Sequence, residues 1–413
     1  IETKKRNNII RKLSKYRVAV RSIPSIADLA KGKRFTDFVD LDIYDLLGRI
    51  QVEPFKELMN KNIYQKTVLV TGAGGSIGSE LCRQIIKLKP HKILLVEISE
   101  YALYSIHSEL EHLNSNIKVI PLLGSVQDVK RMKKIISIWK PATIYHTAAY
   151  KHVPIVEFNL IEGLKNNVIG TFELANIALN HKVSNFVFVS TDKAVRPTNI
   201  MGATKRLAEI CMQGLYEQNK NLNTHFSIVR FGNVLESSGS VIPKFKNQIK
   251  EGGPVTLTHE DITRYFMTST EAAQLVIQAG AMGKNSEVFV LDMGESVKIK
   301  DLIYKMINLS GLSVKDKNNL SGDIEVKITG LRPGEKLYEE LLIGNNPEKT
   351  EHPKIKKIND PSISFTQLEP ELDILKKMIN KNRVDKVKHL LKDILKLYKS
   401  NTSIVDHIYN EQL

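Results

Sequence analysis

The sequence predicts a doubly wound α/β domain, in which helices cover both faces of a parallel sheet. Two observations support this prediction: from Thr67 on, short apolar runs alternate with segments of helix length, and a glycine-rich turn follows the first run. Runs that are β-branched and do not alternate with polar residues are typical of strands buried on both faces. The runs span residues 68–70, 93–96, 143–145, 186–189, 226–229 and 288–291, and they place the domain at about residues 63–290.

Less regular sequence surrounds this domain. Gly252-Gly253-Pro254 and Pro333-Gly334 punctuate a region of weak periodicity, which predicts a smaller α/β lobe for a substrate. The N-terminal segment lacks a complete fold, so we expect the chain to start partway into something larger. The division is therefore an N-terminal segment at 1–62, a dinucleotide-binding domain at 63–232 with a return at 269–292, the lobe at 233–268 and 293–345, and a loop with a helical tail at 346–413.

The composition is that of a large folded chain. With 413 residues, 42% of them hydrophobic, the chain can bury a large core. No run approaches the roughly 18 apolar residues that a membrane-spanning helix needs, and no signal peptide begins the sequence. Two cysteines are too few for a disulfide framework, so we expect Cys82 and Cys211 to be buried thiols in a reducing compartment.

The formal charge of +15 has two concentrations. We expect the lysine-rich stretch from Lys376 to Lys399 to be a solvated helix face. The N-terminal cluster suits a position beside anionic lipid as well as a solvated face. Aromatic residues do not interleave with the charges, so we expect no nucleic-acid partner. The N-terminal cluster consists of Lys4, Lys5, Arg6, Arg11, Lys12, Lys15, Arg17 and Arg21 against the acid Glu2.

A glycine turn lies between the first strand and the helix that follows it. Gly72, Gly75 and Gly78 have the spacing G-x-x-G-x-x-G. Glycines let such a turn close and let its backbone approach a pyrophosphate at the helix N-terminus. A structural turn would also need glycine, but the flanking strand and helix favour dinucleotide binding.

A carboxylate follows at the end of the second strand. Glu97 lies nineteen residues after Gly78, where it can accept hydrogen bonds from the adenosine ribose and would repel a 2′-phosphate. The next residues, Ile98-Ser99-Glu100, offer no Arg or Lys, so NAD is favoured over NADP. The alternative is that Ser99 caps a helix and Glu97 is merely solvated.

Chemistry is expected at the carboxyl ends of the strands, where residues 186–189 deliver Ser190-Thr191-Asp192-Lys193. Short-chain dehydrogenases, which the glycine turn resembles, usually place a Tyr base four residues before a Lys. Here Met201 stands four residues before Lys205, and a thioether cannot exchange a proton. The adjacent Asp192 and Lys193 could instead make two proton transfers on neighbouring substrate carbons. The alternative for this pair is a surface ion pair.

Further motifs follow one another along the chain in the same order as in one protein family. The chain resembles the UDP-N-acetylglucosamine 4,6-dehydratases of bacterial polysaccharide and protein-glycan biosynthesis, which are extended short-chain dehydrogenases, over about residues 20–345. The motifs that carry the resemblance are Ala148–Pro154, Asn166–Thr171, Ser190–Asn199, Met201–Arg206, Arg230–Leu235, Gly239–Pro243, Arg264–Met267 and Gly330–Lys336.

Met201 and Asp45-Leu46-Leu47-Gly48-Arg49 resemble the long, membrane-anchored branch of that family. In that branch, transmembrane helices and another domain precede the segment. The resemblance thus implies a soluble piece of a longer protein at the cytoplasmic face of the bacterial inner membrane. Glu236, where Gly is frequent, and Ser125, where Asp often ends the third strand, depart from the pattern and leave the substrate and adenine contacts open.

The resemblance implies a three-step reaction on a bound UDP-sugar: hydride passes from C4 to NAD⁺, water is lost across C5 and C6, and the hydride returns to C6. Lys193 would remove the C5 proton while Asp192, protonated through a raised pKa, assists loss of the C6 hydroxyl. Thr191 would bond the C4 hydroxyl, whose proton passes to Lys205 or a water relay. Lys205 would also hold the nicotinamide ribose.

We expect residues in several parts of the chain to contact the cofactor and the substrate. We expect no metal site. Arg264 and Arg332 are assigned to the pyrophosphate, Glu335 to the uridine ribose, and Asn233 to a phosphate or the sugar. For Arg332 to Glu335 the alternative is an ordinary turn with a solvated ion pair. The cofactor residues are Gly72, Gly75, Ser76, Ile77, Gly78, Glu97, Ser125, Val126, Ala148, Ala149, Lys151, Asn167, Ser190 and Lys205, and the substrate residues are Lys151, His152, Asn233, Ser240, Val241, Thr258, Arg264, Arg332 and Glu335.

The sequence thus predicts a lyase, an NAD-dependent UDP-N-acetylglucosamine 4,6-dehydratase that retains the configuration at C5. Three alternatives stay open: a dehydratase that inverts C5, a UDP-sugar 4-epimerase, which would need Tyr at position 201, and an inactive NAD-binding module. A homo-oligomer is expected, since exposed helices in such folds often form symmetric assemblies.

Overall fold

The computed structural model describes residues 3–13, 16, 18–22, 39–40, 52–113, 116–235, 237, 239–342, 347–360, 362–400 and 403–412. Two compact units divide the chain. The larger comprises Glu53–Gly232, Ser269–Met293 and Arg332–Leu413, and the smaller comprises Ile1–Val52, Asn233–Thr268 and Gly294–Leu331. Several residues that the sequence analysis singles out lie outside what is described, namely Asp45–Arg49, Glu236, Glu2, Lys15, Arg17 and the side chains of Lys4, Arg6 and Arg11.

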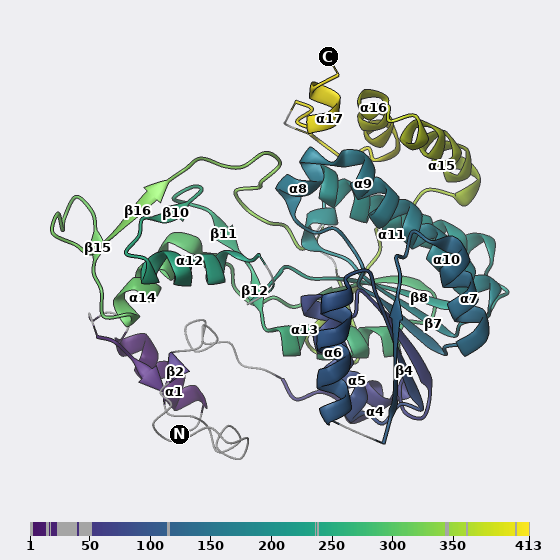
Figure 1. Ribbon diagram of the computed structural model, residues 1–413, viewed down its shortest axis with the longest axis horizontal. Coiled ribbons are helices and arrows are strands. Elements are labelled where there is room, and N and C mark those ends of the chain that lie inside the picture. The colour runs from purple at the N-terminus through teal and green to yellow at the C-terminus, as the bar shows by residue number, and fades with distance from the viewer. Residues whose placement is uncertain are drawn as a thin grey trace. The chain divides into compact units, whose positions relative to one another are not determined.

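A nine-stranded sheet forms the core of the larger unit (Figure 1). The strands run in the order β17-β18-β13-β8-β7-β6-β3-β4-β5, and those from β13 to β5 are parallel. The chain turns from one half of the sheet to the other between β3 and β6, the point at which doubly wound sheets bind ligands. The parallel strands are β3 (Thr67–Thr71), β4 (Lys92–Glu97), β5 (Lys118–Leu123), β6 (Thr143–His146), β7 (Asn185–Val189), β8 (His225–Arg230) and β13 (Ser286–Leu291).

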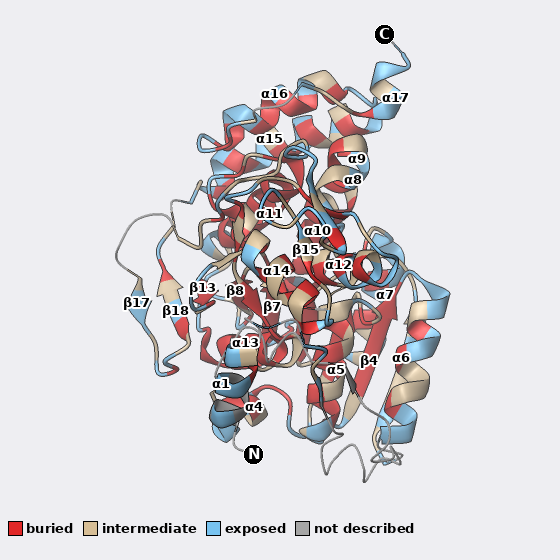
Figure 2. Ribbon diagram, turned by 90° about the vertical axis from the view of Figure 1, so that its left-hand side faces the viewer, coloured by how far each residue is buried: buried red, intermediate tan, exposed pale blue. Residues whose placement is uncertain are grey.

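Helices cover both faces of this sheet, as Figure 1 shows. One group consists of α4 (Lys56–Lys61), α5 (Ser76–Lys87), α6 (Glu100–Leu113) and α13 (Ser269–Met282), and the other of α7 (Val129–Trp139), α10 (Thr171–Asn180) and α11 (Ile200–Gln218). Figure 2 shows the central strands buried and the exposed residues on the outer sides of the helices. This burial on both faces explains why the strand sequences lack polar alternation.

The C-terminal segment is part of this core. Strand β18 (Ile355–Ile358) pairs antiparallel with β13, and β17 (Glu348–Lys349) pairs with β18. Helices α15 (Phe365–Asn380) and α16 (Val384–Ile394) pack beside α11, with Leu368, Leu372 and Leu375 buried. Residues 346–413 are therefore more than a peripheral tail, because they extend the sheet and cover α11. A short helix, α17 (His407–Asn410), ends the segment.

The smaller unit is built from short strands and helices. Strand β10 (Val255–Leu257) pairs parallel with β16 (Ile324–Ile328), which pairs with β15 (Val314–Lys315). Helices α12 (Val241–Lys250) and α14 (Ile299–Leu309) pack with them. The remaining elements are α1 (Thr3–Leu13) and the pairs of β1 (Arg21–Ser22) with β2 (Val39–Asp40), β9 (Asn233–Val234) with β12 (Phe266–Met267), and β11 (Thr263–Arg264) with β14 (Val297–Lys298).

The doubly wound α/β fold is confirmed, and each predicted strand is present. Three strands of the nine-stranded sheet, β5, β17 and β18, are not among the predicted apolar runs. Strand β5 lies at the edge of the sheet, and its residues alternate between exposed and partly buried. Strand β18 contains only four residues, two of them lysines. Residues 332–345, which we assigned to the smaller lobe, instead belong to the larger unit, because Gly334 and Lys336 bond to the loop before α11.

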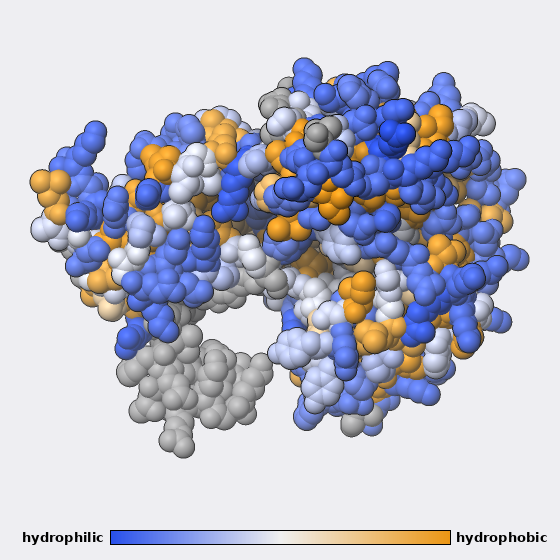
Figure 3. All heavy atoms as spheres, turned by 45° about the horizontal axis from the view of Figure 1, so that its top comes forward, coloured by the Kyte–Doolittle hydropathy of each residue, from blue (hydrophilic) through white to orange (hydrophobic). Residues whose placement is uncertain are grey.

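The prediction of a solvated face for the C-terminal lysines holds with two exceptions. Lys377, Lys381, Lys392 and Lys396 are exposed, whereas Lys376 is partly buried and pairs with Glu173 at 2.8 Å, and Lys388 is buried and donates to the carbonyl of Ser403 at 3.2 Å. Hydrophilic side chains predominate on the face that Figure 3 shows. Cys82 and Cys211 are free and buried, as predicted. Within the described ranges, no helix is both long and apolar enough to cross a bilayer.

Candidate active site

The glycine turn between β3 and α5 leaves room for a ligand's phosphates. Gly72 has a φ of +65°, and a Cβ atom there would lie 2.8 Å from the Cα of Ala148. A Cβ on Gly78 would overlap the carbonyl oxygen of Gly72. The turn can therefore close against the β6 loop only with glycine at these two positions. Gly75 precedes the first turn of α5, whose free backbone amides suit a pyrophosphate.

Glu97 at the end of β4 is held in place by backbone amides. Its carboxylate accepts hydrogen bonds from the amides of Gly74 at 3.0 Å, Ile98 at 2.9 Å and Ser99 at 3.1 Å. The Ser99 hydroxyl also accepts from Ala102 at 3.3 Å, so the helix-capping alternative for Ser99 is present together with an ordered Glu97. Oε1 accepts from both Ile98 and Ser99, whereas Oε2 accepts from Gly74 alone, so Oε2 can still accept a hydrogen bond from a ribose hydroxyl.

A cavity of about 250 Å³ lies beside the glycine turn and Glu97. It opens at the carboxyl ends of the strands, the position expected for a dinucleotide. The predicted cofactor residues that line it are Gly72, Gly75, Glu97, Ser125, Val126, Ala148 and Ala149. Gly124, Thr147, Tyr150 and Asn166 also line it, and the sequence analysis did not assign them to the cofactor, although Tyr150 and Asn166 lie within motifs of the family resemblance.

Asn167 is buried and acts through the backbone of its neighbours. Its amide nitrogen donates to the carbonyl of Tyr150 at 2.9 Å and to the Thr204 hydroxyl at 3.0 Å. Its amide oxygen accepts from the Tyr150 amide at 2.8 Å and from Asn166 at 3.1 Å. These four bonds use the full capacity of an asparagine side chain. Asn167, in a π-helical turn at Lys165–Gly170, therefore positions the cavity wall at Tyr150 rather than binding a ligand through its side chain.

Thr191, Asp192 and Lys193 leave the end of β7 in a single 3₁₀ turn, Asp192–Ala194. The Asp192 carboxyl is fully buried, and its Oδ1 accepts from the Thr191 hydroxyl at 2.9 Å and from Lys193 Nζ at 3.0 Å. Asp192 Oδ2 has no hydrogen-bond partner among the described residues. Burial raises the pKa of Asp192, Lys193 opposes that rise, and the nearby Glu339 adds to it. The pair is thus a buried site and not a surface ion pair.

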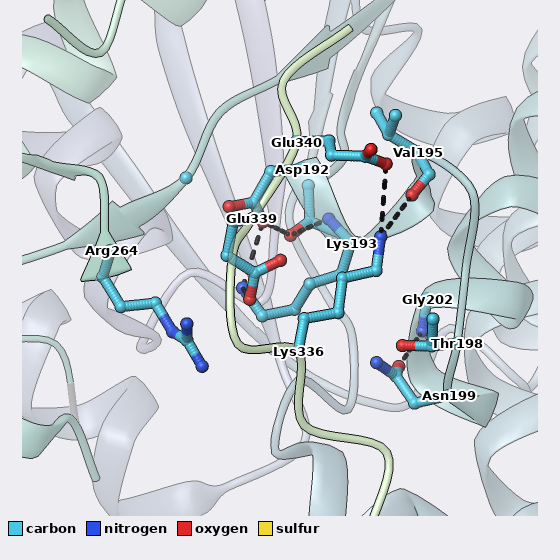
Figure 4. Close-up of polar contacts among 12 residues, drawn as sticks. Asp192, Lys193, Val195, Thr198, Asn199, Gly202, Arg264, Lys336, Glu339 and Glu340 are labelled. Carbon is cyan, nitrogen blue, oxygen red and sulfur yellow. Dashed lines mark hydrogen bonds and ion pairs between the residues drawn. The ribbon is translucent and has the colours of Figure 1, made fainter. Parts of the chain in front are cut away.

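Glu339 is the residue of this site that the sequence analysis missed. Its carboxylate lies 3.3 Å from Lys193 Nζ, and the residue is only 7% exposed (Figure 4). Lys193 therefore lies between two buried carboxylates that are more than 140 residues apart in the sequence. In the sequence, Glu339-Glu340 resembles any solvated acidic pair, so no local signal marks it.

Residues 332–340 are attached to the loop before α11 by several polar contacts (Figure 4). The Asn199 side chain donates to the carbonyl of Gly334 at 3.0 Å, and Lys336 Nζ donates to the carbonyl of Val195 at 2.9 Å. Arg196 pairs with Glu340 at 3.1 Å. These contacts fix the segment that carries Glu339 beside Lys193.

Helix α11 starts at this loop and carries Met201 and Lys205. Asn199 caps it by accepting from the Gly202 amide at 2.7 Å. Met201, four residues before Lys205, is buried at 4% exposure. Lys205 Nζ donates to the carbonyl of Val189 at 2.7 Å and lies 3.8 Å from the centre of the Phe188 ring. Burial lowers the pKa of Lys205 to about 7, against a smaller opposing effect of Glu209.

Ser190 contacts a buried charge network. Its hydroxyl donates to Glu209 at 2.5 Å, and Glu209 also accepts from Arg230 Nε at 2.8 Å. Arg230 in turn pairs with Asp360 at 2.5 Å. The network joins α11, β8 and the C-terminal segment next to the loop that follows β7, so Ser190 makes a structural contact here.

The remaining predicted residues lie in both units. In the larger unit, Lys151 and His152 are exposed before α8 (Val153–Phe158), and the carboxylate of Glu335 accepts from the Arg332 amide at 3.1 Å, so the turn considered as the alternative for Arg332 to Glu335 is present. In the smaller unit, Ser240 precedes α12 and its hydroxyl, although buried, has no hydrogen-bond partner among described residues. The other residues of that unit are Asn233 on β9, Val241 at the start of α12, Thr258 after β10 and Arg264 on β11.

Comparison with known proteins identifies relatives. The family model "Polysaccharide biosynthesis protein" matches residues 68–360. The capsular polysaccharide biosynthesis protein CapD of Staphylococcus aureus is 49% identical over 346 residues, which are 83% of this chain and 56% of CapD. The chain spans about half the length of such curated relatives.

Solved structures also resemble this chain. The structure of Pen from Bacillus thuringiensis aligns with a TM-score of 0.65 and 32% identity, covering 74% of this chain and 97% of Pen. The dTDP-glucose 4,6-dehydratase DesIV from Streptomyces venezuelae, solved with NAD and TYD bound, aligns with a TM-score of 0.57 and 20% identity, covering 67% of this chain and 88% of DesIV. The second likeness shows that the fold is shared.

Proposed function

Since the chain belongs to the polysaccharide biosynthesis protein family, we propose that it is an NAD-dependent UDP-N-acetylglucosamine 4,6-dehydratase that retains the configuration at C5. The observation that supports this most directly is the buried Asp192–Lys193 pair at the carboxyl end of β7. A dehydratase needs an acid and a base on adjacent carbons, and this pair supplies both from neighbouring positions.

NAD fits the cavity at the glycine turn. Gly72 and Gly78 leave a cradle that a Cβ atom would fill, and Glu97 is ordered by three backbone amides beside it. Bound NAD would supply reversible hydride transfer to and from the sugar. Glu97 favours a free ribose over a 2′-phosphate because its charge repels the phosphate.

Lys193, Asp192 and Lys205 each make one of the proton transfers that the reaction requires. Lys193 removes the C5 proton, the electron pair of that bond forms the C5–C6 double bond, and the C6 hydroxyl leaves as water with the proton of Asp192. The raised pKa of Asp192, caused first by burial, favours the protonated acid that this step requires. Lys205, with a pKa of about 7 caused by burial, is suited to receive the C4 hydroxyl proton near neutral pH.

For the substrate's nucleotide end we propose Arg264 and Arg332 at the pyrophosphate, Glu335 at the uridine ribose, and Asn233 at a phosphate or the sugar. We further propose that the protein is held at the cytoplasmic face of an inner membrane by a part outside this chain, and that it forms a homo-oligomer. The N-terminal basic residues that are described, Lys5, Lys12 and Arg21, are exposed, as either a lipid contact or a solvated face requires.

Mass spectrometry of the chain with UDP-N-acetylglucosamine tests this function. We expect a product lighter by one water, and NMR of that product should show the original configuration at C5. Asp192→Asn and Lys193→Ala should each lower the rate at least 100-fold, as loss of an acid or base does. Changes in the exposed pair Glu217–Lys220, namely Glu217→Gln and Lys220→Ala, are the matched controls.

Each rival function predicts another result. Inverted C5 would indicate the inverting dehydratase, and an isomer of unchanged mass would indicate a 4-epimerase, the activity named for Rickettsia rickettsii UDP-glucose 4-epimerase, which is 31% identical over 288 residues. Bound NAD without any product would indicate an inactive module. Full water loss by Asp192→Asn would end the proposal.

A further inference from the structure

We propose that Glu339 is a positioning residue of the reaction, which holds Lys193 and keeps the neighbouring Asp192 in its acid form. This inference rests on the proposed dehydration. It adds a third ionisable group, which no motif of the sequence marks, to the catalytic pair.

The geometry places one amine between two carboxyls. Lys193 Nζ lies 3.0 Å from Asp192 Oδ1 and 3.3 Å from Glu339 Oε1. The side chains of Asp192 and Glu339 are 0% and 2% exposed, and that of Lys193 is 17% exposed. All three groups are therefore largely removed from water, where each unbalanced charge is costly.

Because a net charge is costly in a buried site, the most stable protonation state of this cluster is the one with zero net charge. Two ionised carboxylates with one ammonium would leave a net charge of −1 in a buried site. One added proton makes the cluster neutral. Asp192 is the carboxyl that should hold this proton, because it is the more deeply buried of the two, at 0% exposure against 7% for Glu339. The charge of Glu339 contributes to the raised pKa of Asp192, after the larger effect of burial.

The cluster stays neutral through the elimination if Glu339 takes the proton that Lys193 must lose to become a base. The site then contains an amine and two carboxylic acids. When the C5–H bond breaks, its proton binds to Nζ. When the C6–O bond breaks, Asp192 gives its proton to the departing hydroxyl, which leaves as water. The site afterwards contains an ammonium, the Asp192 carboxylate and the Glu339 acid, so its net charge is again zero.

The attachment of residues 332–340 explains how Glu339 reaches this position. Lys336 donates a hydrogen bond to the carbonyl of Val195, and Asn199 donates one to the carbonyl of Gly334. The stretch from Val195 to Asn199, which follows Lys193, is therefore bonded to this segment at both of its ends. Arg332 and Glu335, the residues proposed for the nucleotide end of the substrate, precede Glu339 in it. Substrate contacts and the partner of Lys193 thus lie on one short stretch of chain.

Glu339→Gln tests the inference, because it keeps the shape of the side chain and removes its charge. A neutral site then contains ammonium and the Asp192 carboxylate, which cannot act as an acid. We expect kcat to fall about 10- to 100-fold with KM and NAD content unchanged, and the pH profile of kcat to move to lower pH. Glu339→Asp, which keeps the charge, should recover part of the rate. Glu217→Gln removes the same charge from the exposed pair with Lys220 and should match the wild type.

Infrared spectroscopy gives a readout that does not need turnover. A protonated buried carboxyl absorbs as a carboxylic acid, and we expect this band in the wild type at neutral pH but not in Asp192→Asn or Glu339→Gln. Persistence of the band in Glu339→Gln, or a pH profile identical to the wild type, would overturn the inference. If the wild type releases no water from its substrate, the proposed function fails, and the band still decides the role of Glu339.

Discussion

Helix α11 approaches the turn that carries Asp192 and Lys193 so closely that a Cβ atom on Gly202 would overlap the carbonyl oxygen of Lys193. The neighbour is backbone, so it can yield only if the turn that carries Asp192 and Lys193 moves. Gly202, although it lies on α11, therefore fixes the position of the proposed acid–base pair. A glycine at this point of a helix is otherwise unfavourable by about 1 kcal/mol relative to alanine.

Gly202→Ala should lower kcat by about 100-fold, the effect expected when reacting groups move by about 1 Å. Gly214→Ala, on the same helix, is the matched control, because its Cβ would meet the side chain of Phe365 at 3.1 Å, and a side chain can adjust. Steady-state kinetics with thermal unfolding of both variants checks the prediction. Equal rates for the two variants would contradict it.

The close packing of the glycine turn between β3 and α5 leads to a second prediction. Gly78→Ala would push a methyl group into the carbonyl of Gly72 and open the turn. We expect NAD content after purification to fall at least tenfold, corresponding to about 1.4 kcal/mol of binding free energy. Ser79→Ala, at the next position of α5, should retain NAD, because the Ser79 hydroxyl bonds within α5, donating to the carbonyl of Ser76 at 3.3 Å and accepting from Arg83 at 3.5 Å. Absorbance of the nucleotide released on denaturation measures both.

The sequence predicted the parts of this protein that depend on local patterns. The buried strands, the glycine turn and the Asp192-Lys193 dipeptide each have a pattern of apolar runs or motif residues that a single segment displays. Strand β18 and Glu339 have none, because their roles depend on partners far along the chain: β18 on pairing with β13, and Glu339 on Lys193. Asn167 had a motif, but only its four hydrogen bonds show that it acts through Tyr150.

The buried charge network behind the loop predicts a large loss of stability. Arg230 is 1% exposed and pairs with both Glu209 and Asp360. Arg230→Met would leave these carboxylates with less compensation and should lower the free energy of unfolding by about 3–5 kcal/mol. Lys220→Met removes an exposed partner and should cost at most about 1 kcal/mol. Chemical denaturation of the two variants tests this, and similar midpoints would contradict it.

Lys205 makes the stability depend on pH. Burial lowers its pKa from 10.5 to about 7 in the folded protein, so between these values the unfolded chain binds more protons than the folded one. The free energy of unfolding should therefore rise with pH across this window, by at most about 1.4 kcal/mol per pH unit. In Lys205→Met, which keeps an apolar stem without the charge, that contribution disappears. Denaturant titrations at several pH values between 7 and 10 measure it, and parallel pH dependences in the two proteins would show that Lys205 stays charged when folded.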